Sequence, residues 1–183
     1  DLTRSRGLGD VYKRQGIIMA FITAQGTMTP LLNYGYDTKT DTQSFGASSS
    51  FTTISGLSVT MALQHASNYF LVMGQLTIGC GSGTSVIATL QAGGSPIDAL
   101  RGASAGNRLR STSRSSQDNQ YEAHTIPLIG MYSPGNTNSY AFTIGGATNA
   151  GTFYVNQSAT SNNDTSRDST RVFSSIQVFE FHS

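Results

Sequence analysis

Apolar and polar residues alternate along most of this chain from Thr38 onward, which is typical of half-buried β-strands. The clearest stretch is residues 57–63, where every second side chain is apolar, and shorter alternations occur at residues 86–90 and 140–144. Residues 69–78 are almost continuously apolar. This run predicts a strand that is covered on both faces.

Turn-forming residues separate these segments. Residues 79–83, 93–96 and 133–136 are rich in Gly, Ser, Pro and Asn, and residues 99–119 and 158–170 are longer polar loops. No segment has a sustained helical period. About eight short strands divided by turns predict an all-β fold, an antiparallel β-sandwich of the jelly-roll type.

Composition agrees with strands rather than helices. The 183 residues include only 11% charged side chains, and lysine occurs only at Lys13 and Lys39. This length fits one domain, and the formal net charge of +1 gives no field suited to nucleic acid. The apolar run at residues 16–24 is far too short to cross a bilayer, so we expect neither a nucleic-acid partner nor membrane insertion.

The first residues differ in character from everything that follows. Residues 1–15 read DLTRSRGLGDVYKRQ and have no strand or helix period. They resemble the translated read-through of a sequencing adaptor, with a genuine start at Met19; a secretory signal and an exposed basic tail are the alternatives. We therefore expect a non-native or disordered extension over residues 1–18, an extended leader over residues 19–37, and the jelly roll over residues 38–183.

Candidate catalytic and metal-binding groups are sparse. His65, His124 and His182 have no second ligand at metal spacing, and the lone Cys80 is expected to pack as a small hydrophobic residue. We expect no metal, no cofactor and no catalytic residue; three copies of His124 around a threefold axis remain an alternative. The loop acids are Asp98, Asp118, Glu122, Asp164 and Asp168, and a glycosidase would need two of them across a cleft.

Positive charge gathers in one loop. Its four arginines suggest a solvated loop, arginines that bridge subunits, or a site for an acidic surface glycan, with two tyrosines as sugar-stacking rings. The candidate ligand-binding residues are Arg101, Arg108, Arg110, Arg114, Tyr121 and Tyr154.

The last predicted strand is apolar on both faces. The aliphatic residues on one face are Val172, Ile176 and Val178, and the residues on the other face are Phe173, Phe179 and Phe181. An isolated sandwich could leave one face in water, so this pattern favours an oligomer with the phenylalanines at the subunit interface.

Several motifs resemble a group of small marine phage structural proteins. Residues 50–60 are similar to that group's "ITGLSVTITP", residues 67–73 to "SSKILVMV", residues 131–135 to a "D-x-P-G" turn, residues 140–142 with 150–156 to "YKVQ…AGTAYLNR", and residues 174–180 to "SSITVMEI". Their order and spacing match over residues 38–181. The sequence departs from the group at His65-Ala66 and in the arginine loop, which has no clear counterpart.

The resemblance implies a tail-fibre or virion-surface module whose jelly roll is related to the trimeric heads of tumour necrosis factor and complement. We therefore expect a non-enzymatic homotrimer on the surface of the virion. It would contact other virion proteins and bind host surface polysaccharide through avidity. A capsid decoration or assembly protein without a receptor role and a glycan-degrading enzyme are the alternatives.

Overall fold

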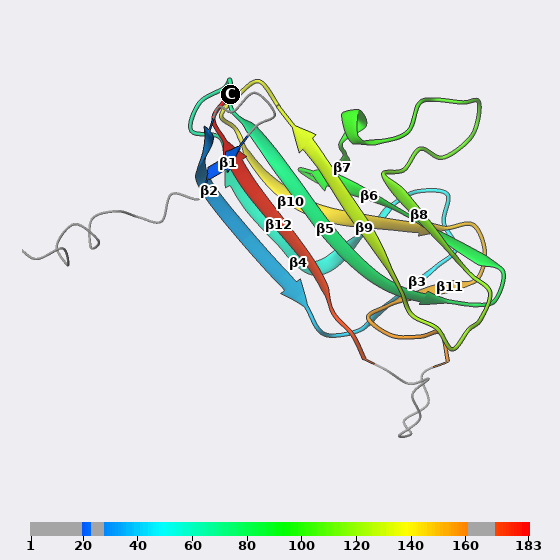
Figure 1. The fold of residues 1–183 in the computed structure, drawn as a ribbon. Helices are drawn as coiled ribbons and strands as arrows, with labels where there is room; N and C mark the ends of the chain where they lie inside the picture. Colours follow the sequence, from blue (N-terminus) through cyan, green and yellow to red (C-terminus); the bar gives the residue numbers. More distant parts are fainter. Residues whose placement is uncertain (1–19, 23–27, 161–170) are drawn as a thin grey trace, which may run out of the picture.

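Two antiparallel sheets packed face to face form the protein (Figure 1). The computed structural model describes residues 20–22, 28–160 and 171–183, and the all-β sandwich expected from the sequence is confirmed. Within these residues there are twelve strands and one 3-10 turn, η1 (Asp98–Leu100). The strands are β1 (Ala20–Ile22), β2 (Met28–Lys39), β3 (Gln43–Gly46), β4 (Thr52–Ala62), β5 (Tyr69–Cys80), β6 (Thr84–Ala92), β7 (Ser95–Pro96), β8 (Ser113–Gln117), β9 (His124–Tyr132), β10 (Ser139–Thr148), β11 (Thr152–Val155) and β12 (Ser174–Phe181).

Strand connectivity is that of a jelly roll. The larger sheet has the order β1-β2-β12-β5, with β9 on the other edge of β5 and β11-β3 beside the end of β5. The smaller sheet has the order β4-β10-β6, and β7 and β8 both pair with β6. The principal strands β2-β12-β5-β9 therefore face β4-β10-β6-β8, so that the first strand pairs with the last, as two nested Greek keys require.

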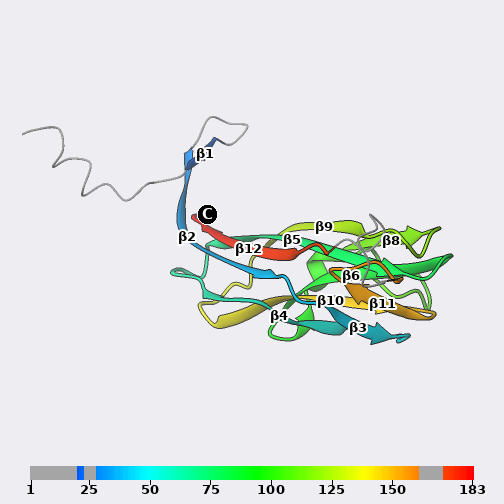
Figure 2. The same cartoon turned by 90° about the horizontal axis from the view of Figure 1, so that it is seen from below.

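The core lies between the inner faces of the two sheets (Figure 2). The alternation at residues 57–63 is confirmed, because Leu57, Val59, Met61 and Leu63 are all buried. The rings of Phe70 and Phe142, one from each sheet, meet edge to face with 4.8 Å between their centroids. Such a pair adds about 0.5–1.5 kcal/mol to the stability gained from buried area.

The sandwich begins earlier than the sequence pattern suggested. Strand β2 pairs with β12 from Lys39 opposite Ser174 to Leu31 opposite Phe181, so residues 31–37 belong to the sandwich rather than to a separate leader. Gly35 allows this pairing, since a Cβ there would lie 2.7 Å from Cγ1 of Val59 on β4. Pairing with β2 satisfies the backbone of β12 on the edge that β5 leaves free. The extension predicted over residues 1–18 lies outside the described residues.

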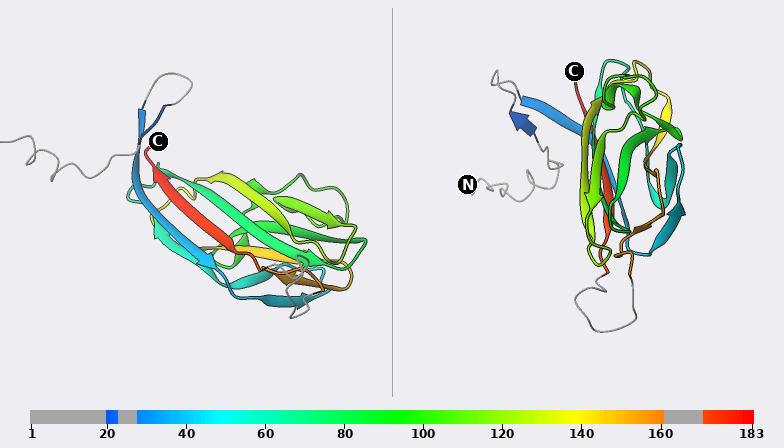
Figure 3. Two further views of the ribbon diagram at one scale, coloured as in Figure 1. Left: turned by 60° about the horizontal axis from the view of Figure 1, so that its bottom comes forward. Right: turned by 90° about the vertical axis from the view of Figure 1, so that its right-hand side faces the viewer.

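An arm projects from one end of the molecule. Strand β1 pairs with the first residues of β2, and both extend beyond the sandwich beside the C-terminus (Figure 3). The long loop between β7 and β8, which both pair with β6 of the smaller sheet, lies on the side of the molecule away from this arm (Figure 1).

Candidate functional site

The loop between β7 and β8 is fastened to the sandwich at its start. Ile97 is buried in the core, and Leu100 in η1 packs so closely on Gly130 of β9 that a Cβ at residue 130 would force the leucine side chain to move. Ile97 directly follows β7, which pairs with β6 of the smaller sheet, whereas Gly130 belongs to β9 of the larger sheet. The two contacts therefore attach the loop to both sheets. The arginines of the loop are therefore carried on an anchored segment.

Two of these arginines are bound to one carboxylate. Arg101 and Arg110 both reach Oδ1 of Asp98, the latter from Nη1 at 3.3 Å. Arg110 also donates from Nε to the carbonyl oxygen of Gly102 at 2.6 Å. The hydrogen bond from Arg101, followed by the charges of Arg101 and Arg110, holds the pKa of Asp98 below its ordinary value. Arg101 and Arg110 thus stabilise the conformation of the loop.

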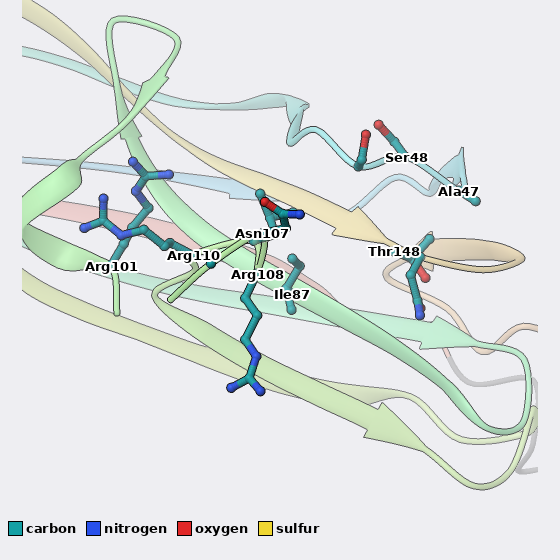
Figure 4. Close-up of a pocket in the computed structure, with 12 residues that line it drawn as sticks. Ala47, Ser48, Ile87, Arg101, Asn107, Arg108, Arg110 and Thr148 are labelled. Atoms are coloured by element: carbon teal, nitrogen blue, oxygen red, sulfur yellow. The ribbon is translucent and has the colours of Figure 1, made fainter. Parts of the chain in front are cut away.

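A hollow of about 720 Å³ opens beside the loop (Figure 4). Its lining residues come from four separate segments: Ala47, Ser48, Ser49, Ile87, Arg101, Gly106, Asn107, Arg108, Leu109, Arg110, Thr148 and Asn149. No Asp or Glu is among them. Figure 4 shows Arg101 and Arg110 close together, whereas the side chain of Arg108 points in another direction and Thr148 lies across the hollow.

Arg114 lines a second, smaller hollow of about 190 Å³ with Ser85, Ile87 and Asn149. Its Nη2 donates to Oγ of Ser85 at 2.7 Å. Ile87 and Asn149 line both hollows, so the two adjoin. The structure therefore brings the four predicted arginines to one region of the surface.

The two predicted tyrosines lie elsewhere. Tyr121 is exposed in the loop between β8 and β9, and Tyr154 is half-buried on β11, opposite Gly79 of β5. Neither ring lines either hollow, so the structure does not place them as stacking platforms beside the arginines. Ser48, Ser49, Thr148 and Asn149 were not predicted as part of this site. They are ordinary residues of a loop and of the end of β10, and only the fold brings them to the arginines.

A second notable surface is the side of the larger sheet that faces away from the core, here called the outer face. It consists of alternate residues of four adjacent strands: Tyr34, Tyr36 and Thr38 on β2; Ser175, Gln177, Phe179 and Phe181 on β12; Tyr69, Leu71, Met73 and Gln75 on β5; Thr125, Pro127, Ile129 and Met131 on β9. None of these side chains is charged. Four of the seven large hydrophobic side chains that are exposed in the described chain belong to it, with exposed fractions from 52% to 66%.

The predicted interface phenylalanines occupy three different environments. Phe173 is exposed just before β12, and Phe179 is half-buried with its ring stacked 5.9 Å from that of Tyr34. Phe181 is only 4% exposed, and its ring stacks on that of Tyr69 of its own chain, with 5.7 Å between the centroids. Ile176 and Val178 point into the core, as the alternation predicted.

Other potential chemistry in the described residues is limited. No group of three or more His, Cys, Asp or Glu there could hold a metal ion, and Nε2 of His124 lies 3.0 Å from a carboxylate oxygen of Glu122. Burial raises the pKa of the Cys80 thiol. None of the described helical segments has the length and apolar character to span a membrane. Asp164 and Asp168 lie outside the described residues.

Comparison with known proteins gives distant structural matches alone. No family model and no curated protein matches the sequence. Infectious bursal disease virus Gx strain gives a TM-score of 0.35 at 14% identity, covering 89% of this chain and 42% of that one. The VP2 subviral particle of the same virus gives a TM-score of 0.35 at 12% identity, covering 90% and 47%. The chain thus spans less than half of either, and likeness at this level indicates no shared function.

Proposed function

We propose that the chain is a non-enzymatic structural protein of a phage virion, which assembles as a homotrimer and serves as a tail-fibre or surface adhesion head. The observation that carries this proposal is the uncharged, apolar outer face of the larger sheet. A sheet face exposed to water normally carries polar and charged side chains. Exposed apolar patches rimmed by polar residues are typical of surfaces that contact another protein.

Apolar side chains form a continuous row across the outer face. The strand register places Tyr34 opposite Phe179, Phe179 opposite Leu71, and Leu71 opposite Met131. The next position along the strands gives a second row, from Tyr36 through Met73 to Ile129, with Gln177 between. Aromatic residues and methionine are also the types enriched at protein interfaces.

A second copy of the chain is the partner that this face fits best. Because the face has no charged side chain, the faces of neighbouring copies can pack around a threefold axis without leaving an unpaired charge buried. The face also has both knobs and a hollow: Tyr36 is 64% exposed, and a depression of about 210 Å³ lies between Met73, Pro127 and Gln177. A projecting side chain such as Tyr36 on one copy can therefore pack into the depression on a neighbouring copy.

The assignment to a phage virion rests on the resemblance of the sequence motifs. Those motifs fall on strands β4, β5, β10, β11 and β12 and on the turn after β9, which together make up much of both sheets. The resemblance therefore concerns the sandwich itself. The arginine loop, which has no counterpart in that group, is an addition to it.

A capsid decoration protein would assemble through the same outer face. The two functions differ in the loops, which bind a ligand in an adhesion head and have no binding role in a decoration protein. A glycan-degrading enzyme is disfavoured because, among the described residues, no carboxylate lines either hollow beside the arginine loop. Glycosidases need two carboxyl groups on opposite sides of the scissile bond.

The mass of the protein in solution tests the proposal. We expect a species of about three times 19.4 kDa at micromolar concentration. Tyr36→Lys and Ile129→Lys each place a charge on the outer face and should shift the protein toward monomer, with self-association weakened at least about tenfold. Thr60→Lys, on an exposed position of β4 in the other sheet, is the matched control and should leave the mass unchanged. A monomeric parent protein overturns the proposal.

A further inference from the structure

We infer that the surface around the arginine loop binds an extended anionic polysaccharide, with Arg108 and Arg114 as its principal contacts. The site is the pair of adjoining hollows, here called the arginine trough, and it runs from Ser48 and Arg108 past Ile87 and Asn149 to Arg114. This inference deepens the adhesion role and rests on the proposed function for its biological meaning.

The trough is continuous because of the register between β6 and β8. Arg114 on β8 lies opposite Ile87 on β6, and Ile87 lines both hollows. Val86 and Ala88 on either side point into the core, so the side chain of Ile87 faces outward. Arg114 thus extends the line of positive charge from the loop onto the outer side of the smaller sheet.

Two guanidinium groups remain available in the trough. Arg101 and Arg110 are held by Asp98, whereas Arg108 is exposed and its side chain makes no hydrogen bond or ion pair to the described residues. Arg114 has a single hydrogen bond, to Ser85, and keeps its other N–H donors. Planar guanidinium groups match carboxylate and sulfate oxygens in pairs, and no carboxylate lines the trough to compete.

The spacing of the charges favours a polymer over a single small anion. Arg108 points away from Arg101 and Arg110, so the guanidinium groups do not converge on one point (Figure 4). A phosphate or sulfate ion needs several donors aimed at one centre, whereas a chain with repeated charges can meet separated arginines in turn.

The lining favours a sugar chain over single-stranded nucleic acid. Nucleic-acid grooves of this kind use aromatic rings on which bases stack. No aromatic side chain of the part of the chain that the structure describes lines either hollow. The trough offers small polar groups instead, on Ser48, Ser49, Asn107 and Asn149. Hydroxyl and amide groups of this type suit the hydroxyls of a saccharide.

Binding at the trough is compatible with assembly. The trough lies on the smaller sheet and its loops, whereas the outer face belongs to the larger sheet, so a trimer built on that face would leave three troughs open (Figure 2). Each contact would be weak, since it uses exposed charges. Three linked copies would raise the overall affinity through avidity.

Binding of dextran sulfate to the intact protein, measured by calorimetry, tests the inference. We expect binding that weakens with added NaCl, because exposed charge pairs are screened. Arg108→Gln and Arg114→Gln should each weaken it about fivefold, a loss of about 1 kcal/mol as expected of an exposed ion pair. Arg171→Gln removes the same charge from an exposed position that lines neither hollow and should leave binding unchanged.

Three results would overturn the inference. The first is that the Arg108 and Arg114 variants bind dextran sulfate as tightly as the parent protein does. The others are that the parent binds a single-stranded oligonucleotide as tightly as dextran sulfate, or that free sulfate ion at matched ionic strength displaces dextran sulfate completely. Neutral dextran should not bind. Mass measured on the same samples separates this inference from the assembly proposal. A monomer that binds dextran sulfate through Arg108 contradicts assembly alone, and a trimer that does not bind contradicts the trough alone.

Discussion

The hydroxyl of Ser174 donates a 2.7 Å hydrogen bond to Oδ1 of Asn156, and this bond ties the start of β12 to the end of β11. The amide of Asn156 also donates to the carbonyl oxygens of Lys39 and Asp41, at 2.7 and 2.9 Å. Asn156 is fully buried and has a φ of 62°, a conformation that asparagine tolerates better than most residues. One side chain therefore joins the ends of three strands.

We expect Asn156→Ala to lower the free energy of unfolding by about 2–4 kcal/mol. The change removes three hydrogen bonds, leaves the buried Ser174 hydroxyl without this partner, and puts alanine at a positive φ. Urea denaturation followed by circular dichroism measures the effect. Asn138→Ala, at an exposed turn position, is the control and should change stability by less than about 0.5 kcal/mol.

A second variant separates the two causes. Asn156→Gly relieves the backbone strain and still loses the hydrogen bonds, so it should recover only about 1 kcal/mol relative to alanine. A glycine variant as stable as the parent protein would show that backbone conformation alone matters at this position.

Gly79 permits a close backbone contact that no side chain can share. A Cβ at residue 79 would collide with the carbonyl oxygen of Gln157 and the backbone of Ser158, neither of which is the end of a flexible side chain. Gly79→Ala should therefore lower the melting temperature by several degrees, since a loss of 1 kcal/mol corresponds to roughly 2–4 °C in a domain of this size.

Gly46→Ala is the matched control for this substitution. Gly46 lies at the end of β3, and nothing is within 4 Å of a Cβ placed there. Calorimetry should give a melting temperature for Gly46→Ala equal to or above that of the parent protein. Equal melting temperatures for the two alanine variants would contradict the close approach.

Asp98→Asn should loosen the arginine loop. The substitution removes the charge that holds Arg101 and Arg110, so trypsin at neutral pH should cleave after the loop arginines several times faster than in the parent. Asp118→Asn, an exposed acid with no ion pair to the described residues, is the control. Equal rates for Asp98→Asn and Asp118→Asn would show that Asp98 does not anchor the loop.

The ion pairs of Asp98 with Arg101 and Arg110 also determine the pH range in which the loop is stabilised. Because the pKa of Asp98 is lowered in the folded protein, the stabilisation from this carboxylate is present above its unfolded pKa of about 3.9 and is lost as the pH falls through the lower, folded value. Tryptic protection of the parent loop should therefore not vary between about pH 6 and about pH 9 through this group.

The alternation of apolar and polar residues was enough to predict the fold class and much of the core. At residues 57–63 the pattern identifies the buried side chains correctly, because a strand turns every second residue to the same side. The same reasoning placed Ile176 and Val178 inside. The clustering of four arginines within residues 101–114 is likewise visible in the sequence, although the structure places Arg114 on β8 and the other three in the loop before it.

Partners that are distant in the chain were decided only by the tertiary structure. Residues 31–37 have no regular period, yet they form a strand because β12 offers them a free edge. Phe181 has the pattern of an interface residue, but Tyr69 of the same chain covers it. Long-range strand pairing likewise decides that Tyr121 and Tyr154 lie apart from the arginines. Local pattern determines which way a side chain points from its strand, whereas what meets it there depends on long-range pairing.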